Sequence, residues 1–329
     1  MTPTRIDRGK SDRGGLDRAP SGAHAGLKPH GPITVRALAK INLFLHVGER
    51  QANGYHDLKS LVVFADYGDT LRAEHAAALS LSIEGPFSRG LPVSDDNLVL
   101  KAARALAQRV GRQAQGRILL TKRLPIASGI GGGSADAAAA LRALAQLWEI
   151  DVSHDEMLQI ADGLGADVPM CIASAPAFVE GRGERISPVC KLPDFALVLA
   201  NPMVEVSTAE AFKQLKSRTG VDGIRCPQQF EGLEALIGYL RTTNNDLEQP
   251  AIEIAPMISD VLSELRRQPN ILLARMSGSG ATCFGLFAHR EHAHVCATQV
   301  ARAHPEWWVV GAGLAATDFV TPSVIESLT

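Results

Sequence analysis

The first half of the chain opens with alternating hydrophobic and polar positions. Period-two patterns rich in β-branched residues predict half-buried strands. These strands are expected at 33–47, 58–64, 70–74, 79–83 and 118–121. An amphipathic pattern at 97–110 predicts a helix, with Asp95 or Asp96 as its N-cap and Gly111 at its end. The N-terminal half is therefore predicted to be built around a sheet.

The sequence PIASGIGGGSADAAAAL, residues 125–141, changes in its middle from a glycine loop to an alanine-rich helix over 135–148. The helix is predicted to bury one stripe, formed by Leu141, Leu144, Ala145 and Trp148. Glycines allow successive backbone N–H groups to point at one ligand, and a helix N-terminus favours anions. The stretch predicts a phosphate-binding loop, the alternative being a turn that only lets the helix pack close to the sheet. It is neither a Walker loop nor a dinucleotide fingerprint, because no lysine follows and Ser134 replaces the last glycine.

Beyond residue 195 the predicted elements follow the order β-α-β-β-α-β. Strands are expected at 195–200, 271–276, 282–288 and 307–312, and helices at 208–215, 246–267 and 291–303. This order is typical of the split ferredoxin-like arrangement, with helices on one face of an antiparallel sheet. Before it, Ser153 and Glu156 predict a helix-capping box, and 177–189 predicts a hairpin. We therefore divide the chain into domains at 33–190 and 191–329.

The composition is that of a globular protein. The chain has 329 residues, 46% of them hydrophobic, and a formal net charge of −2. This charge argues against a general nucleic-acid binder, and no apolar run approaches the roughly 18 residues that span a membrane. The five cysteines form no C-x-x-C pair, so we expect a cytoplasmic protein. Residues 1–32 have almost no large apolar side chains and are predicted to be a disordered tail rather than a transit peptide.

Lys40 and Asp167 are the candidate catalytic residues. Lys40 lies in a strand-like segment whose alternation places Lys40, Asn42 and Phe44 on one face. An exposed strand lysine and, for Asp167, an ordinary N-cap before Pro169 are the alternatives. If the fold brings the two together beside a phosphate loop, the carboxylate could orient or deprotonate a hydroxyl and the ammonium could offset the developing charge.

Three further segments are candidates for binding. The Tyr55-His56 pair follows a turn at Asn53-Gly54 and could stack on a flat ring and hydrogen-bond its edge. A second glycine loop, MSGSGA at 276–281, is either a hairpin turn or part of a ligand site. The histidines near residue 290 lack a metal-binding pattern and are interpreted as a solvated helix start.

Together these segments resemble the GHMP kinases, a superfamily of small-molecule kinases. The similar motifs run from about residue 33 to the end and are AKINLFLHV, RxxNGYHDL, DNLVLKA, LPIASGIGGGSADAAAAL, LGADVPM, VSTAEAF, NDLE and MSGSGATCF. The glycine loop and MSGSGA are typical of the superfamily, whereas the lysine strand followed by NGYH is similar to members whose acceptor is a cytidine diphosphate-linked methylerythritol. The resemblance implies an α+β fold with an N-terminal ribosomal-S5-like α/β domain, a C-terminal ferredoxin-like domain and an active site in the cleft between them.

The resemblance also implies the site residues. ATP, arriving with Mg²⁺, would be bound by Asn97, Pro125, Ala127, Ser128, Gly129, Ile130, Gly131, Gly132, Gly133 and Ser134. The pair Lys40 and Asp167 would act on the acceptor's 2-hydroxyl, in non-mevalonate isoprenoid precursor synthesis. The acceptor would contact Asn42, Tyr55, His56, Thr208, Phe212, Gly278 and Ser279. Among these, Tyr55 and Phe212 would stack on the cytosine faces and His56 would bond the cytosine edge.

Two alternatives stay open. One is a GHMP kinase that acts on mevalonate or a sugar, and the aromatic residues Tyr55 and Phe212 argue against it. The other is a non-catalytic sensor on the same fold, which would have no need of Lys40 and Asp167. Glycine often stands in the family where this chain has Ala127, which bears on nucleotide affinity. A monomer or weak homodimer with no resident metal, nucleic-acid or membrane partner is expected.

Overall fold

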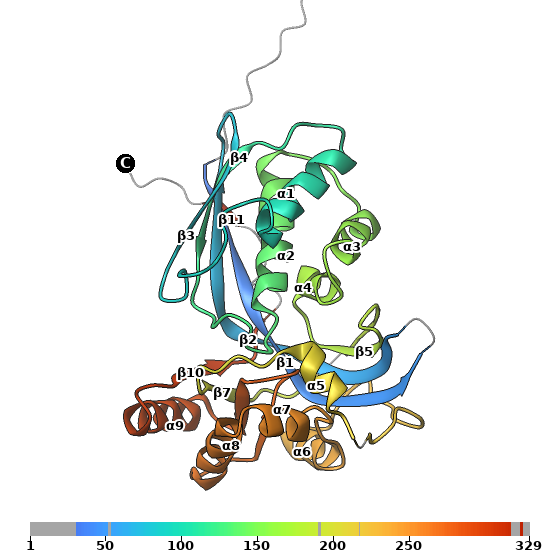
Figure 1. Ribbon diagram of the computed structural model, residues 1–329, viewed down its shortest axis with the longest axis vertical. Helices are drawn as coiled ribbons and strands as arrows, with labels where there is room; N and C mark the ends of the chain where they lie inside the picture. The colour runs from blue at the N-terminus through green and yellow to red at the C-terminus, as the bar shows by residue number, and fades with distance from the viewer. Residues whose placement is uncertain (1–30, 52–53, 190–191, 217, 317–322, 325–329) are drawn as a thin grey trace, which may run out of the picture.

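The computed structural model describes residues 31–51, 54–189, 192–216, 218–316 and 323–324 (Figure 1). Residues 1–30 of the predicted tail and the predicted domain boundary at residue 190 lie outside these ranges, so both stay predictions. Within the described ranges, no helix combines the length and apolar character needed to cross a membrane.

The first sheet is built on two long antiparallel strands, β1 and β2. Its strands are β1 Ile33–Arg50, β2 His56–Glu74, β3 Leu79–Glu84, β4 Gly116–Thr121, β5 Ala177–Gly181, β6 Arg185–Pro188 and β11 Ser323–Val324. The main order is β11-β1-β2-β4-β3, and β5 and β6 form a hairpin that pairs with β2. The two strands predicted at 58–64 and 70–74 are one continuous strand. The polar residues between them stay in the strand because tertiary partners satisfy them: Asp66 accepts hydrogen bonds from Arg290 and from the Gly313 N–H.

Four helices cover one side of this sheet, as Figure 1 shows. They are α1 Leu98–Arg109, α2 Gly132–Leu147, α3 His154–Asp162 and α4 Val168–Ala173. The N-cap of α1 is Asn97, not Asp95 or Asp96, because the Asn97 side-chain oxygen accepts the Val99 N–H at 2.9 Å. The capping box between Ser153 and Glu156 is confirmed at the start of α3.

Helix α2 differs from its prediction in two ways. It begins at Gly132, earlier than expected, after Gly131 in the left-handed conformation. It is also buried on nearly every side rather than along one stripe, and residues 137–141 have no exposed surface. The reason is its position: α2 packs against β1 and β2 on one side and against α1 and α4 on the other. Alanine is favoured there because it lets the neighbouring elements approach closely.

The second sheet confirms the ferredoxin-like prediction. Its strands are β7 Ala196–Asn201, β8 Leu273–Met276, β9 Cys283–Phe287 and β10 Trp308–Gly313, in the antiparallel order β10-β7-β9-β8. The helices are α5 Thr208–Lys213, α6 Leu233–Arg241, α7 Glu248–Ile254, α8 Met257–Arg267 and α9 Arg290–Ala303. The single helix predicted at 246–267 is divided at Pro256, where the ring removes the backbone donor that a continuous helix needs. Helix α6 was not predicted.

The outer edge of β1 joins the two halves of the molecule. The described residues of β11, Ser323 and Val324, pair with Thr34 and Ile33, so the rest of the β1 edge needs other partners. The C-terminal half supplies them: the Leu45 N–H donates to the Asn244 carbonyl at 3.0 Å, and the Leu45 carbonyl accepts from the Asp246 N–H at 2.9 Å. Strand β1 is therefore held from both sides at the segment that carries Lys40 and Asn42.

Candidate active site

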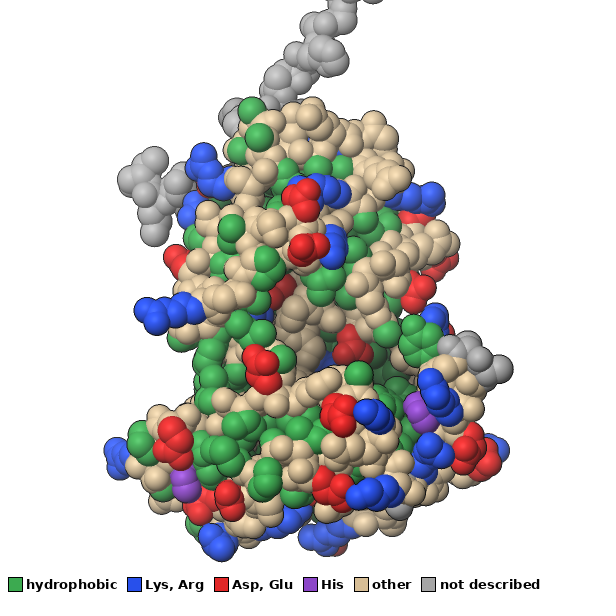
Figure 2. Space-filling model, viewed as in Figure 1, with side chains coloured by type: hydrophobic (Ala, Val, Ile, Leu, Met, Phe, Trp, Pro, Cys, Tyr) green, Lys and Arg blue, Asp and Glu red, His purple; other side chains and the backbone are tan. Residues whose placement is uncertain are grey.

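A cavity of about 670 Å³ lies between the two sheets, and Figure 2 shows the hollow between the upper and lower parts of the molecule. Its N-terminal wall comes from β1, the glycine loop before α2, the start of α4 and the turn between β5 and β6. Its C-terminal wall comes from residues 206–208, Phe212 and the second glycine loop at 278–279. The cavity is therefore formed where the two halves of the chain meet, a common location for ligand sites.

The two glycine loops contact each other at the cavity. Gly129 has φ 75° and Gly131 has φ 67°, a conformation that favours glycine. A Cβ atom on Gly129 would lie 2.6 Å from the Gly280 carbonyl oxygen, and one on Gly131 would lie 3.3 Å from the Lys40 Cβ. Only glycine therefore allows this close approach, and the N-terminus of α2 is left facing the cavity with its unpaired amides.

The structure brings Lys40 and Asp167 together. The Lys40 Nζ donates to the Asp167 Oδ2 at 2.7 Å, across 127 residues of sequence. The Lys40 side chain is 7% exposed and that of Asp167 is 41% exposed, so the ammonium is held inside and the carboxylate faces the cavity. The Lys40 N–H donates to the Ile130 carbonyl at 2.9 Å, which ties this strand to the glycine loop.

Neither alternative for this pair describes what the structure shows. Lys40 is buried rather than exposed on its strand. Asp167 occupies the N-cap position of α4, but its side chain makes no capping hydrogen bond. Helix α4 is instead held at its other end, where the half-buried Arg142 donates to the carbonyls of Cys171 at 2.6 Å and Ile172 at 2.9 Å. Burial lowers the pKa of Arg142 to about 10. The Asp167 carboxylate is thus available for Lys40 and a ligand.

Asn42 lies beside this pair, and part of its side chain is unsatisfied. Its Nδ2 donates to the Ser60 Oγ at 2.7 Å, and its backbone N–H donates to the Ser277 Oγ at 3.1 Å. Its buried Oδ1 accepts no hydrogen bond from any described residue. Asn42 is thus a residue of the cavity wall whose buried amide oxygen has hydrogen-bonding capacity left over. Phe44, expected on the same face, packs instead into the core with Phe178, because a β-bulge between Asn42 and Phe44 breaks the alternation.

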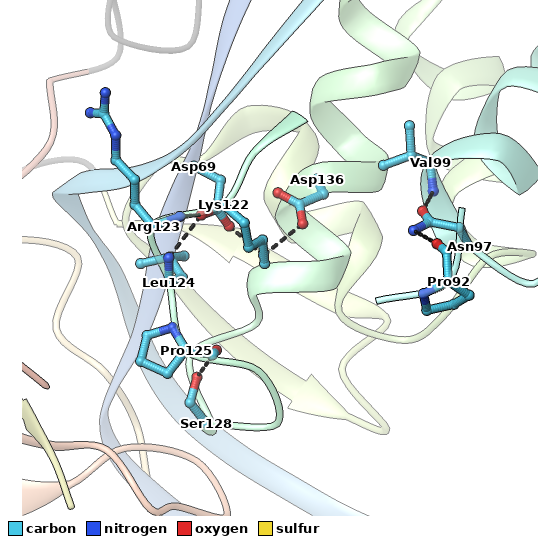
Figure 3. A network of polar contacts seen from close by, with 10 residues as sticks. All are labelled: Asp69, Pro92, Asn97, Val99, Lys122, Arg123, Leu124, Pro125, Ser128 and Asp136. Atoms are coloured by element: carbon cyan, nitrogen blue, oxygen red, sulfur yellow. Dashed lines mark hydrogen bonds and ion pairs between the residues drawn. The ribbon is translucent and has the colours of Figure 1, made fainter. Parts of the chain in front are cut away.

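The sequence did not predict a buried cluster of charged side chains that lies beside the glycine loop. Lys122 donates to Asp136 at 2.7 Å and to Asp69, and these residues link β2, the residue after β4 and the second turn of α2 (Figure 3). Burial raises the pKa of Asp136 to about 7; the Lys122 ammonium opposes the increase and the Asp69 carboxylate adds to it. Burial lowers the pKa of Lys122, but the two carboxylates outweigh burial and raise it. No local pattern indicates this cluster, because its members come from three elements.

The aromatic residues predicted for the acceptor lie near the cavity mouth. The rings of His56 and Phe212 stack with centroids 5.4 Å apart, and the His56 Nδ1 lies 3.0 Å from the Gly48 carbonyl oxygen. Tyr55 is 57% exposed, and the Arg182 guanidinium lies 5.6 Å from its ring centre. Of the predicted turn, Asn53 lies outside the described residues.

The predicted site residues can be divided into those that line the cavity and those that do not. All of the predicted site residues line the cavity except Ile130, Tyr55 and His56. Asn97 uses both ends of its amide inside the protein, because it caps α1 and its Nδ2 donates to the Pro92 carbonyl at 2.8 Å. The hydroxyls of Thr208 and Ser279 lie 2.7 Å apart and connect α5 to the second glycine loop. The ligand roles of these residues stay predictions.

Comparisons with known proteins agree with this architecture. The model of the GHMP kinases N terminal domain matches residues 97–175, and that of the GHMP kinases C terminal domain matches residues 228–306. A 4-diphosphocytidyl-2-C-methyl-D-erythritol kinase of Cereibacter sphaeroides is 52% identical over 280 residues, which cover 84% of this chain and 97% of that protein. The chain belongs to this family of GHMP kinases.

Other relatives support the assignment. The kinase of the same name from Parvibaculum lavamentivorans is 47% identical over 85% of this chain and 97% of its own length. A crystal structure of 4-(cytidine 5'-diphospho)-2C-methyl-D-erythritol kinase has a TM-score of 0.68 and 32% identity over 86% of this GHMP kinase and 99% of that chain. Homoserine kinase from Cytophaga hutchinsonii, at 17% identity and a TM-score of 0.66 over 91% of this chain and 98% of that one, shares the fold.

Proposed function

We propose that this kinase transfers the γ-phosphate of ATP to the 2-hydroxyl of 4-diphosphocytidyl-2-C-methyl-D-erythritol and so forms the 2-phosphate for isoprenoid precursor synthesis. The observation that carries the proposal is the Lys40–Asp167 pair, with its 2.7 Å contact, in a cavity that also contains the glycine loop. The names of relatives up to 52% identical support the choice of acceptor. The protein acts in the cytoplasm, as a monomer or weak homodimer, on small molecules alone.

The glycine loop and the N-terminus of α2 bind the phosphates of ATP. The residues at this helix start line the cavity, so their unpaired N–H groups can donate to a phosphate there, and no Cβ at Gly131 obstructs its approach to Lys40. The side chains of Ser128 and Ser134 line the same wall. The ATP phosphates are therefore held next to the catalytic pair by amides that are already in position before the nucleotide binds.

Asp167 and Lys40 act on the acceptor hydroxyl. Asp167 accepts the hydrogen bond of the hydroxyl and takes its proton as the bond to phosphorus forms. Lys40, fixed by burial and by its contact with Asp167, offsets the negative charge that develops on the attacking and transferred oxygens. Asn42, which lines the same cavity beside this pair, contacts the erythritol part of the acceptor.

Mg²⁺ fits this site as a companion of ATP rather than as a resident ion. Among the residues that the structure describes, no three His, Cys, Asp or Glu side chains are grouped as metal ligands. The ion would therefore be held mainly by the nucleotide phosphates and water, as is usual for Mg²⁺ in kinases. Bound in this way, it would neutralise charge on the phosphate oxygens.

The aromatic residues at the cavity mouth bind the cytosine ring. Tyr55 and Phe212 supply stacking faces, and His56 supplies a ring nitrogen for the base edge. Thr208, Gly278 and Ser279 close the C-terminal wall behind the acceptor. A mevalonate or galactose acceptor has no aromatic ring for these faces to hold.

The proposal is tested by ATP consumption with the purified chain. The cytidyl acceptor is compared with mevalonate, galactose and homoserine at equal concentrations, and ADP release is followed. We expect turnover with the cytidyl acceptor alone. Turnover with another acceptor would overturn the cytosine site but keep the phosphate loop, and ATP binding without any turnover would favour a sensor.

A further inference from the structure

The cavity wall contains a cation that the proposed mechanism does not use. Across the described ranges, the lysines and arginines that line the cavity are Lys40, Lys122 and Arg182. Lys40 is paired with Asp167, and Lys122 is enclosed by two buried carboxylates. The Arg182 side chain is 45% exposed, and its nearest carboxylate, Glu184, lies 3.9 Å from the Nε. Arg182 therefore carries the positive charge in this wall that is least neutralised by the protein itself.

Arg182 lies between the aromatic residues and the catalytic pair. It occupies the turn of the β5–β6 hairpin, and Gly181 at the end of β5 pairs with Leu58, just after the Tyr55-His56 pair. Its guanidinium carbon is 5.6 Å from the Tyr55 ring centre. On the other side of the turn, a Cβ on Gly183 would lie 3.4 Å from the carbonyl oxygen of Ala166, the residue before Asp167.

The acceptor has a matching order of chemical groups. It consists of a cytosine base, a ribose, two phosphates and the methylerythritol whose hydroxyl reacts. If the base is held near Tyr55 and the hydroxyl near Asp167, the diphosphate must lie between them. Because the chain has a net charge of −2, a dianionic diphosphate linker needs a local cation there. This step rests on the proposed function.

We propose that Arg182 binds the diphosphate of the acceptor and thereby selects a nucleoside diphosphate-linked substrate. A guanidinium presents a planar fork of donors that suits two oxygens of a phosphate, and its remaining face stays against the Tyr55 ring. The residue thus links recognition of the base to recognition of the diphosphate. The ATP phosphates are a different source of the same chemistry, but the observed neighbour of the guanidinium is Tyr55, on the side proposed for the acceptor base.

The test compares Arg182→Met with wild type in steady-state kinetics with ATP and the cytidyl acceptor. We expect the KM for the acceptor to rise about ten- to a hundredfold, the range of a charge-assisted hydrogen-bonding contact, with the KM for ATP unchanged. Arg182→Lys should recover part of the loss. Arg185→Met is the matched control: it removes the same charge from the same hairpin, its side chain is 59% exposed and paired with Asp57, and it does not line the cavity.

Two competitive inhibitors locate the contact. In Arg182→Met, the inhibition constant of CDP against the acceptor should rise as much as the acceptor KM, whereas that of cytidine should stay at its wild-type value. An equal rise for cytidine would show that Arg182 only supports the Tyr55 ring, and a rise in the ATP KM would assign it to the nucleotide phosphates. Either result, or kinetics equal to wild type, overturns the inference while the proposed function stands. If wild type does not phosphorylate the cytidyl acceptor, it is the proposed function that fails.

Discussion

Replacing Asp167 by asparagine separates catalysis from helix capping. The substitution keeps the size of the side chain and leaves an amide oxygen that can still accept the Lys40 hydrogen bond seen at 2.7 Å. It removes the negative charge and the ability to take a proton. Since the Asp167 side chain makes no capping hydrogen bond to α4, the change removes nothing from the helix.

The magnitudes follow from these contacts. Loss of a positioned acid-base group typically costs about 10²- to 10⁴-fold in rate, or roughly 3–5 kcal/mol of activation free energy. The effect on stability should be much smaller. Asp167 is 41% exposed, so solvent screens its interaction with Lys40 and the free energy of unfolding should change by no more than about 1 kcal/mol.

The assay combines turnover with denaturant unfolding. We expect Asp167→Asn to lose at least about a hundredfold in kcat, with both KM values close to wild type and nearly unchanged unfolding. Ser153→Ala is the control, because Ser153 does cap a helix: it should lose about 1 kcal/mol of stability and no activity. If Asp167→Asn instead turned over normally and lost stability as Ser153→Ala does, the catalytic role assigned to Asp167 would be wrong.

Three further changes test the surroundings of the site. Gly131→Ala should raise the ATP KM and lower kcat, because the added Cβ would lie 3.3 Å from the Lys40 Cβ. The control is Gly111→Ala, which has a similar φ of 65° but no atom within 4 Å of the added Cβ; it should lose about 1 kcal/mol of stability without a change in the kinetics. For Asp136, the folded pKa of about 7 exceeds the ordinary 3.8, so the native state keeps a proton that the unfolded chain loses, and the free energy of unfolding of the wild type declines as the pH rises from about 4 to 7. Chemical denaturation of Asp136→Asn over this range should show a decline that is smaller by up to about 1.4 kcal/mol per pH unit. The same slope in both proteins would contradict the assignment. The Arg275 guanidinium, on β8, donates to the backbone carbonyls of Leu43, Leu240 and Thr243. Arg275→Met leaves these carbonyls without that donor and should destabilise the chain by about 3 kcal/mol in urea unfolding; a loss below about 1 kcal/mol would show that water replaces the guanidinium.

Local patterns were sufficient for most elements and for the position of the glycine loop. The β-α-β-β-α-β order, the capping box at Ser153 and the glycine loop each depend on residues close together in sequence, where propensity and periodicity act directly. The resemblance to GHMP kinases then supplied residue roles that periodicity does not contain. Lys40 and Asp167 could be proposed as a pair in this way, although 127 residues separate them.

Predictions failed where tertiary contacts replace local ones. The predicted buried stripe on α2 was too narrow because the sheet and two helices enclose this helix. Strand β2 continues through a polar segment because Arg290 and the Gly313 N–H donate hydrogen bonds to Asp66. The expected N-cap of α1 was misplaced by one or two residues, a difference that local composition does not resolve.

The sequence by itself determined most of the elements and the position of the glycine loop, because hydrophobic period and glycine content act over a few neighbouring residues. Only the tertiary structure decided which charges are enclosed and which face the cavity. Lys122 is neutralised by carboxylates from two other elements, whereas Arg182 is left exposed beside Tyr55. Burial and charge pairing are properties of several distant segments at once, and they exist only after the chain has folded.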